Sequence, residues 1–106
     1  MFLSECSTNS LKAAAQSIVD GHLVAFPTET VYGLGADATN ESAVAKVYKA
    51  KGRPADHPLI VHIASIDAIG EWAEDISEYA INLARDFWPG PMTLIFKRSQ
   101  LAKDFV

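Results

Sequence analysis

The sequence predicts an α/β domain with a twisted, open, mixed sheet and flanking helices. Short apolar runs of strand length alternate with segments whose apolar residues recur at helical spacing, and turn signals separate the two. With 106 residues, of which 49% are hydrophobic, the chain can bury roughly two thirds of its unfolded surface in one domain. Alternation by itself leaves the order and direction of the strands open.

The first predicted elements are a helix and a buried strand. Asn9 or Ser10 can cap the helix, and Gly21 offers a left-handed stop. The strand runs from His22 to Phe26, and its continuous apolar centre is typical of a sheet that is covered on both faces. The apolar residues of the helix follow its period: Leu11, Ala14, Ala15 and Ile18.

The middle of the chain predicts a helix, a strand and a short helix. Asn40 can cap the first of these, which ends at Gly52. A β-rich run covers residues 59–63, and a short helix extends from Ser65 through Trp72. Each helix has an apolar side, formed by Val44, Val47 and Tyr48 in the first and by Ile66, Ile69 and Ala73 in the second.

The last elements are a longer helix and a strand. The helix begins at Ser77, and the Pro-Gly-Pro sequence at residues 89–91 breaks it. A strand is expected to resume over residues 93–96. The helix presents Ala80, Leu83, Ala84 and Phe87 at helical spacing.

The composition limits the class of protein. The net charge of -4 argues against a surface that coats nucleic acid, although four of the nine basic residues lie in one short segment: Lys46, Lys49, Lys51 and Arg53. Cys6 stands alone, so no internal disulfide is expected. No apolar run approaches the ~20 residues of a membrane span, and no signal-peptide pattern is present. We therefore expect a cytoplasmic protein that does not contact a membrane.

Two polar segments are candidate sites. Lys51 and Arg53, separated by a glycine at a helix end, can converge on one phosphate, although a solvated helix terminus has the same composition. Thr28, Thr30 and Tyr32 alternate along an extended segment and can place three hydroxyls on one face, although such a face can also simply meet water. We expect Gly33 and Gly35, just beyond, to permit positive φ and a close approach of a ligand.

The histidines do not predict a metal site. His57 and His62 have no cysteine or third histidine near them, so a zinc site is disfavoured. No serine lies in a Gly-x-Ser-x-Gly elbow either, which argues against a hydrolase of that type.

Three segments together resemble the YrdC-like family of threonylcarbamoyl-AMP synthases: FPTETVYGLG at residues 26–35, KGRP at 51–54 and PLIVH at 58–62. The resemblance implies a YrdC-like fold and a nucleotidyltransferase. Such an enzyme forms L-threonylcarbamoyladenylate from L-threonine, bicarbonate and ATP, for N6-threonylcarbamoyladenosine at position 37 of tRNA. Magnesium is the implied metal, and tRNA-modification proteins are the implied partners.

The resemblance also assigns site residues. Lys51 and Arg53 match the family's Lys-x-Arg motif, so they become catalytic and ATP-binding candidates, and His57 matches a further ATP position. Thr30 and His62 match threonine-binding positions, and we group Thr28 and Tyr32 with them.

The family's second motif, Ser-x-Asn, belongs to the later part of the family domain. No Ser-x-Asn follows the Lys-x-Arg motif in these 106 residues, and the one tripeptide of this kind lies before it, at residues 7–9. We therefore expect the chain to be an incomplete, N-terminal part of a single YrdC-like domain, and to be inactive when isolated. The alternative is an RNA- or nucleotide-binding module without catalysis. YrdC-like domains of hydrogenase-maturation proteins normally adjoin zinc-finger and acylphosphatase segments, and the chain shows neither.

Overall fold

The computed structural model describes residues 7–52, 54, 58–100 and 102. The chain separates into two compact units, with the boundary between Leu59 and Ile60. None of the helices in the described segments is both long and apolar enough to cross a bilayer.

Helix α1 (Thr8–Val19) opens the first unit. Its N-cap is Ser7, whose side chain accepts a hydrogen bond from the Ser10 amide at 3.1 Å. The expected cap at Asn9 or Ser10 is therefore wrong by two or three residues. The stop is confirmed, because Gly21 follows the helix with φ 85°. A Cβ on Gly21 would lie 3.1 Å from Nδ2 of the Asn40 side chain, so glycine is favoured there by space as well.

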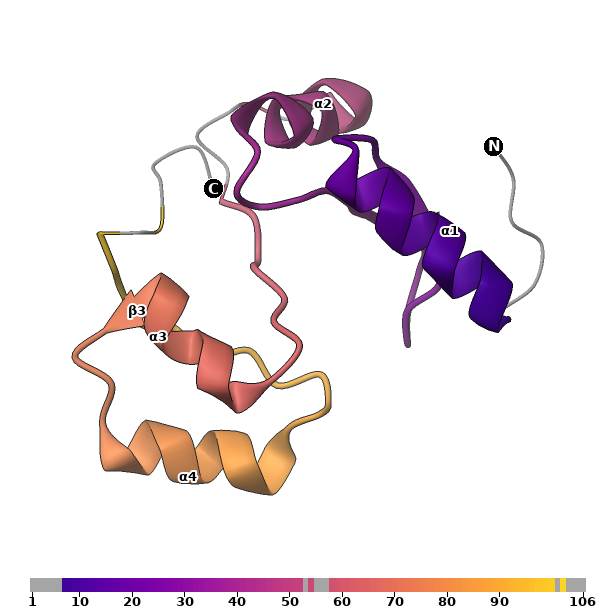
Figure 1. Ribbon diagram of the computed structural model, residues 1–106. Helices are drawn as coiled ribbons and strands as arrows, with labels where there is room; N and C mark the ends of the chain where they lie inside the picture. The colour runs from indigo at the N-terminus through magenta and orange to yellow at the C-terminus, as the bar shows by residue number, and fades with distance from the viewer. Residues whose placement is uncertain (1–6, 53, 55–57, 101, 103–106) are drawn as a thin grey trace. The chain divides into compact units, whose positions relative to one another are not determined.

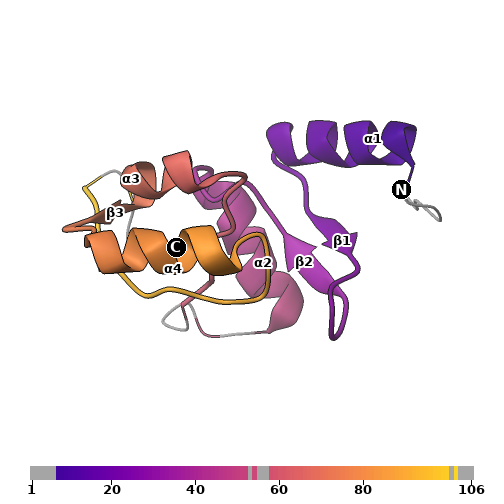
Figure 2. The ribbon, with the colours of Figure 1, turned by 90° about the horizontal axis from the view of Figure 1, so that it is seen from below.

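Strands β1 (Val24–Phe26) and β2 (Gly33–Gly35) form an antiparallel hairpin, which Figure 2 shows beside α1. Phe26 pairs with Gly33 and Val24 with Gly35. The predicted strand is present but shorter than His22–Phe26, and the expectation that it is buried on both faces is wrong. Ala25 and Phe26 are exposed, because the hairpin is a two-stranded sheet.

Helix α2 (Glu41–Lys51) is the best-buried element of the first unit. Asn40 caps it, as predicted, by accepting from the Ala43 amide at 3.2 Å, and Gly52 ends it with φ 64°. Its buried residues lie on one face: Ala43, Val44, Val47 and Tyr48. The apolar side predicted for this helix is confirmed.

The second unit packs two helical segments together. The 3-10 turn η1 (Ile66–Ala68) runs into α3 (Ile69–Trp72), and α4 (Glu78–Phe87) lies alongside them (Figure 1). The start expected at Ser77 is confirmed to within one residue, because Ser77 is the N-cap of α4 and accepts from the Ala80 amide at 3.1 Å. The core consists of Ile69, Ala73 and Ala84, with partly buried apolar residues packed against it: Ile63, Ile66, Ile76, Ile81, Trp88, Leu94 and Phe96. Phe87 shares the helical spacing of Ala80, Leu83 and Ala84 but not their burial, since its side chain is 57% exposed.

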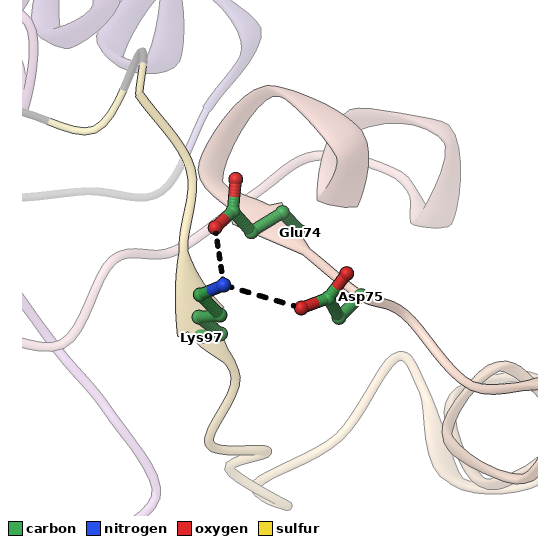
Figure 3. A network of polar contacts seen from close by, with 3 residues as sticks. All are labelled: Glu74, Asp75 and Lys97. Carbon is green, nitrogen blue, oxygen red and sulfur yellow. Dashed lines mark hydrogen bonds and ion pairs between the residues drawn. The ribbon is translucent and has the colours of Figure 1, made fainter.

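Strands β3 (Ala73–Glu74) and β4 (Lys97–Arg98) pair antiparallel in the second unit. Lys97 lies opposite Glu74, and its ammonium is 3.0 Å from that carboxylate and 3.3 Å from Asp75 (Figure 3). These two hydrogen-bonded acids, Glu74 first, raise the pKa of Lys97. Asp75 has φ 55°, in the left-handed region that a side chain disfavours.

Two predicted strands are not strands in the described part of the chain. Residues 59–63 and 93–96 have alternating exposure, as extended chain does, but carry no ladder pairing. The exposed members include Ile95, which is 95% exposed. Alternation predicts which way side chains point, but a strand also needs a partner within hydrogen-bonding distance.

The fold class is therefore confirmed only as mixed α/β. The described residues form four α-helices and two small antiparallel sheets of two strands each. The open mixed sheet that we expected is wrong for these residues, because each strand that forms a ladder does so within a local antiparallel pair.

Candidate functional site

The structure places the predicted site residues in three segments. Thr28, Thr30 and Tyr32 lie in the loop that joins β1 to β2, and Lys51 is the last residue of α2. His62 lies in an extended segment of the second unit. Arg53 and His57 are outside the described residues.

The Phe26 ring packs against Gly33 and Gly35 at the base of the β1–β2 loop. A Cβ on Gly35 would lie 2.8 Å from a carbon of the Phe26 ring, and one on Gly33 would lie 3.1 Å from two ring carbons. In the described segments the glycines with positive φ are Gly21 and Gly52. Gly33 and Gly35 therefore do not adopt the positive φ that glycine permits. These two glycines admit the Phe26 ring, which fixes the geometry from which the loop departs.

The loop itself is organised by the Thr28 side chain. Its hydroxyl donates to the Val31 carbonyl and accepts from the Thr30 amide at 3.3 Å. The Thr28 and Thr30 hydroxyl oxygens are 3.5 Å apart. The structure therefore brings two of the three predicted hydroxyl residues together.

The end of the loop exposes apolar surface. Val31 is 74% exposed and Tyr32 is 78% exposed, and the residues from Ala25 to Tyr32 are exposed throughout. An exposed valine and an exposed tyrosine that follow the two threonines in the loop offer a small ligand both apolar carbon atoms and hydroxyl groups.

The basic segment divides into a structural lysine and a cationic helix end. Lys46 donates from Nζ to the Gly21 carbonyl at 2.9 Å and so ties α2 to the end of α1. Lys49 and Lys51 lie in the last turn of α2 and are exposed. Their charges complement the negative end of the helix dipole. Sequence reasoning grouped Lys46 with the others, because its partner lies 25 residues away and leaves no local signal.

A tight turn precedes α2. Thr39 donates to the Asp37 carboxylate twice, from its hydroxyl at 2.6 Å and from its amide at 2.9 Å. These bonds, the hydroxyl first, lower the pKa of Asp37. Sequence reasoning missed this pair, although an Asp-x-Thr spacing before a helix is typical of a side-chain turn.

His62 is presented outward from an anchored segment. Its neighbours Val61 and Ile63 are half-buried, and Ile63 packs against the core of the second unit, whereas His62 is exposed. No group of three or more His, Cys, Asp or Glu residues within the described ranges could hold a metal ion.

The fold and these segments define a small mixed α/β protein that presents hydroxyl groups on a hairpin loop and positive charge at a helix end. Residues 16–106 match the Sua5/YciO/YrdC family, which carries the description "Telomere recombination". The chain belongs to this family.

Two similar relatives are threonylcarbamoyl-AMP synthases. The chain is 55% identical over 91 residues to that of Pyrococcus abyssi and 53% identical over 93 residues to that of Bacillus subtilis. Each match covers 86% of the chain but only 27% of the relative. The crystal structure of P. abyssi Sua5 complexed with L-threonine has a TM-score of 0.89 and 49% identity, over 96% of this chain and 30% of that one.

Proposed function

We propose that this chain contributes the N-terminal part of a single domain that forms L-threonylcarbamoyladenylate from L-threonine, bicarbonate and ATP. The product serves threonylcarbamoyl modification of tRNA adenosine. The observation that carries the proposal is the identity of 55% to a threonylcarbamoyl-AMP synthase across the segments that hold the candidate residues. The similarity to an enzyme solved with L-threonine supports the choice of amino acid.

The chemistry requires two joined steps. The threonine amine attacks bicarbonate, and loss of water leaves a carbamate. A carbamate oxygen then attacks the α-phosphorus of ATP, the bond from that phosphorus to the bridging oxygen breaks, and pyrophosphate leaves with the electron pair. Both reactants are anions, so the site must hold them close together despite their repulsion.

The resemblance to the family supplies the residue roles in this proposal, and the need to hold two anions explains the cations among them. Lys51 and Arg53 neutralise and orient the phosphates, with the guanidinium able to contact two oxygens at once, and His57 contacts the nucleotide. Thr30, Tyr32 and His62 bind L-threonine. Magnesium is the metal implied by ATP. The described residues contain no group of three or more His, Cys, Asp or Glu that could hold a metal ion, and no step here is assigned to magnesium.

The decisive experiment measures pyrophosphate release by the full-length protein. Release should require L-threonine, bicarbonate and ATP together. Arg53→Ala should lower kcat/KM by an amount equivalent to about 2 kcal/mol or more, because charge-assisted hydrogen bonds to the phosphates are lost. Lys49→Ala is the matched control, since it removes a charge from the same helix end without altering the Lys-x-Arg pair.

Two outcomes would contradict the proposal. Unchanged turnover in Arg53→Ala would show that the Lys-x-Arg pair does not act on the ATP phosphates. Binding of ATP or RNA without threonine-dependent pyrophosphate release would instead identify a binding module. The isolated 106 residues should release no pyrophosphate. By this proposal they form only part of the active site, and a partial site cannot position three reactants.

A further inference from the structure

The Thr28 hydroxyl has little capacity left for a ligand. A hydroxyl carries one proton, and that of Thr28 is donated to the Val31 carbonyl. The same oxygen accepts from the Thr30 amide at 3.3 Å. The Thr28 and Thr30 hydroxyl oxygens are 3.5 Å apart, and in a hydrogen bond between them Thr30 must therefore be the donor. Thr28 cannot donate to a bound molecule while the loop keeps this shape.

The methyl group of Thr28 also has a fixed position. A Cβ built on Gly33 would lie 3.3 Å from the Thr28 methyl and 3.1 Å from the Phe26 ring. The methyl therefore lies over Gly33, beside the ring. Since a β-branched side chain has few accessible χ1 rotamers, fixing the methyl also fixes the direction of the hydroxyl.

We propose that Thr28 is a positioning residue, which shapes residues 28–31 and acts on L-threonine binding only through Thr30. The inference rests on the proposed function for its ligand. In this arrangement Thr28 receives the Thr30 hydroxyl proton, which leaves the lone pairs of Thr30 to accept hydrogen bonds from the amino acid. Thr28 itself does not touch the ligand.

A double-mutant cycle in the full-length protein tests the inference. Thr28→Val keeps the branched shape and removes the hydroxyl, Thr28→Ser keeps the hydroxyl and removes the methyl, and Thr30→Val removes the contacting group. Calorimetry should show that Thr28→Val weakens L-threonine binding on the order of tenfold, as expected for lost hydrogen bonds. Thr28→Ser should restore most of the affinity. The KM for ATP should stay unchanged in both Thr28 variants.

The cycle separates a positioning role from direct contact. If Thr28 acts through Thr30, the double variant Thr28→Val/Thr30→Val should bind L-threonine no more weakly than Thr30→Val alone. Losses that multiply would show independent contacts and overturn the inference. A Thr28→Ser variant as weak as Thr28→Val would also overturn it, because the hydroxyl would then not be the operative group.

Amide hydrogen exchange without ligand supplies a second measurement. The Thr30 amide should exchange faster in Thr28→Val than in the parent or in Thr28→Ser, because its acceptor is lost. Equal exchange in all three would overturn the inference. If the parent protein does not bind L-threonine, the proposed function fails instead, and the Thr30 exchange rates decide the role of Thr28 alone.

Discussion

Replacing Asp75 by Ala, Gly or Asn separates the backbone conformation of this residue from its ion pair. Asp75 has φ 55°, and its carboxylate is 3.3 Å from Lys97 Nζ. The side chains of Asp75 and Lys97 are 76% and 66% exposed. Ion pairs between such solvated groups contribute little to stability. A residue with a Cβ costs about 1–2 kcal/mol in the left-handed region, so the backbone conformation should dominate.

We expect Asp75→Ala to be the least stable of the three variants. Glycine tolerates the left-handed region but lowers stability by about 0.4–1 kcal/mol through its freedom in the unfolded chain. The net difference between Asp75→Ala and Asp75→Gly should therefore be about 1 kcal/mol in the free energy of unfolding. Asp75→Asn should stay close to the parent, because asparagine also tolerates this conformation and only the charge is lost.

Urea denaturation of the full-length protein measures these differences. Exchange of the Ser99 amide, which donates to the Trp72 carbonyl at 3.0 Å, is a local measure beside β3 and β4. In 1 M salt any difference between the parent and Asp75→Asn should shrink, while the difference between Ala and Gly should persist. Equal unfolding free energies for Asp75→Ala and Asp75→Gly would refute the reasoning.

Two further predictions use the first unit. Gly52→Ala should lower the free energy of unfolding by about 1 kcal/mol, because Gly52 has φ 64° and a Cβ there meets no atom within 4 Å. Gly70→Ala is the matched control in α3: it also meets nothing within 4 Å but should raise stability by about 0.5–1 kcal/mol, so equal losses would contradict the argument. Thr39→Val removes the strongest cause of the lowered pKa of Asp37. A lowered folded-state pKa contributes stability above the unfolded value of about 3.9 and loses it as pH falls through the folded value. The stability difference between parent and Thr39→Val should thus be present at pH 7 and shrink in acid, and a constant difference from pH 7 to pH 2 would oppose this.

The helices could be predicted because their signals are local. A cap such as Asn40 or Ser77 acts on an amide three residues away, and a stop such as Gly52 acts on the turn before it. The start of α1 was harder, because Ser7, Asn9 and Ser10 are all competent caps within four positions. The structure shows which of the three is used, because the Ser7 hydroxyl oxygen accepts a hydrogen bond from the Ser10 amide.

The sheets could not be predicted in the same way. Residues 93–96 have the alternation of a strand, yet the ladder with β3 begins at Lys97. The partner of a strand is chosen by segments far away in sequence, and alternation carries no information about them. The same limit applies to Lys46, whose acceptor at Gly21 belongs to another helix end. For the candidate site, hydroxyl spacing predicted the segment, but the hydrogen bonds within the loop depend on its three-dimensional shape.

The β1–β2 loop combines order with exposure, and this combination suits a binding site. The contact of Phe26 with its facing glycines fixes the base, and the bonds of Thr28 fix residues 28–31. Beyond them, Val31 and Tyr32 remain largely exposed. Ordering a flexible side chain on binding costs about 0.5–1.5 kcal/mol, so a loop that is already shaped keeps more of its contact energy as affinity. Exposure of apolar groups is unfavourable in the free protein, and burial of these groups by a ligand would recover that free energy. The loop therefore has the physical properties that the proposed L-threonine site requires.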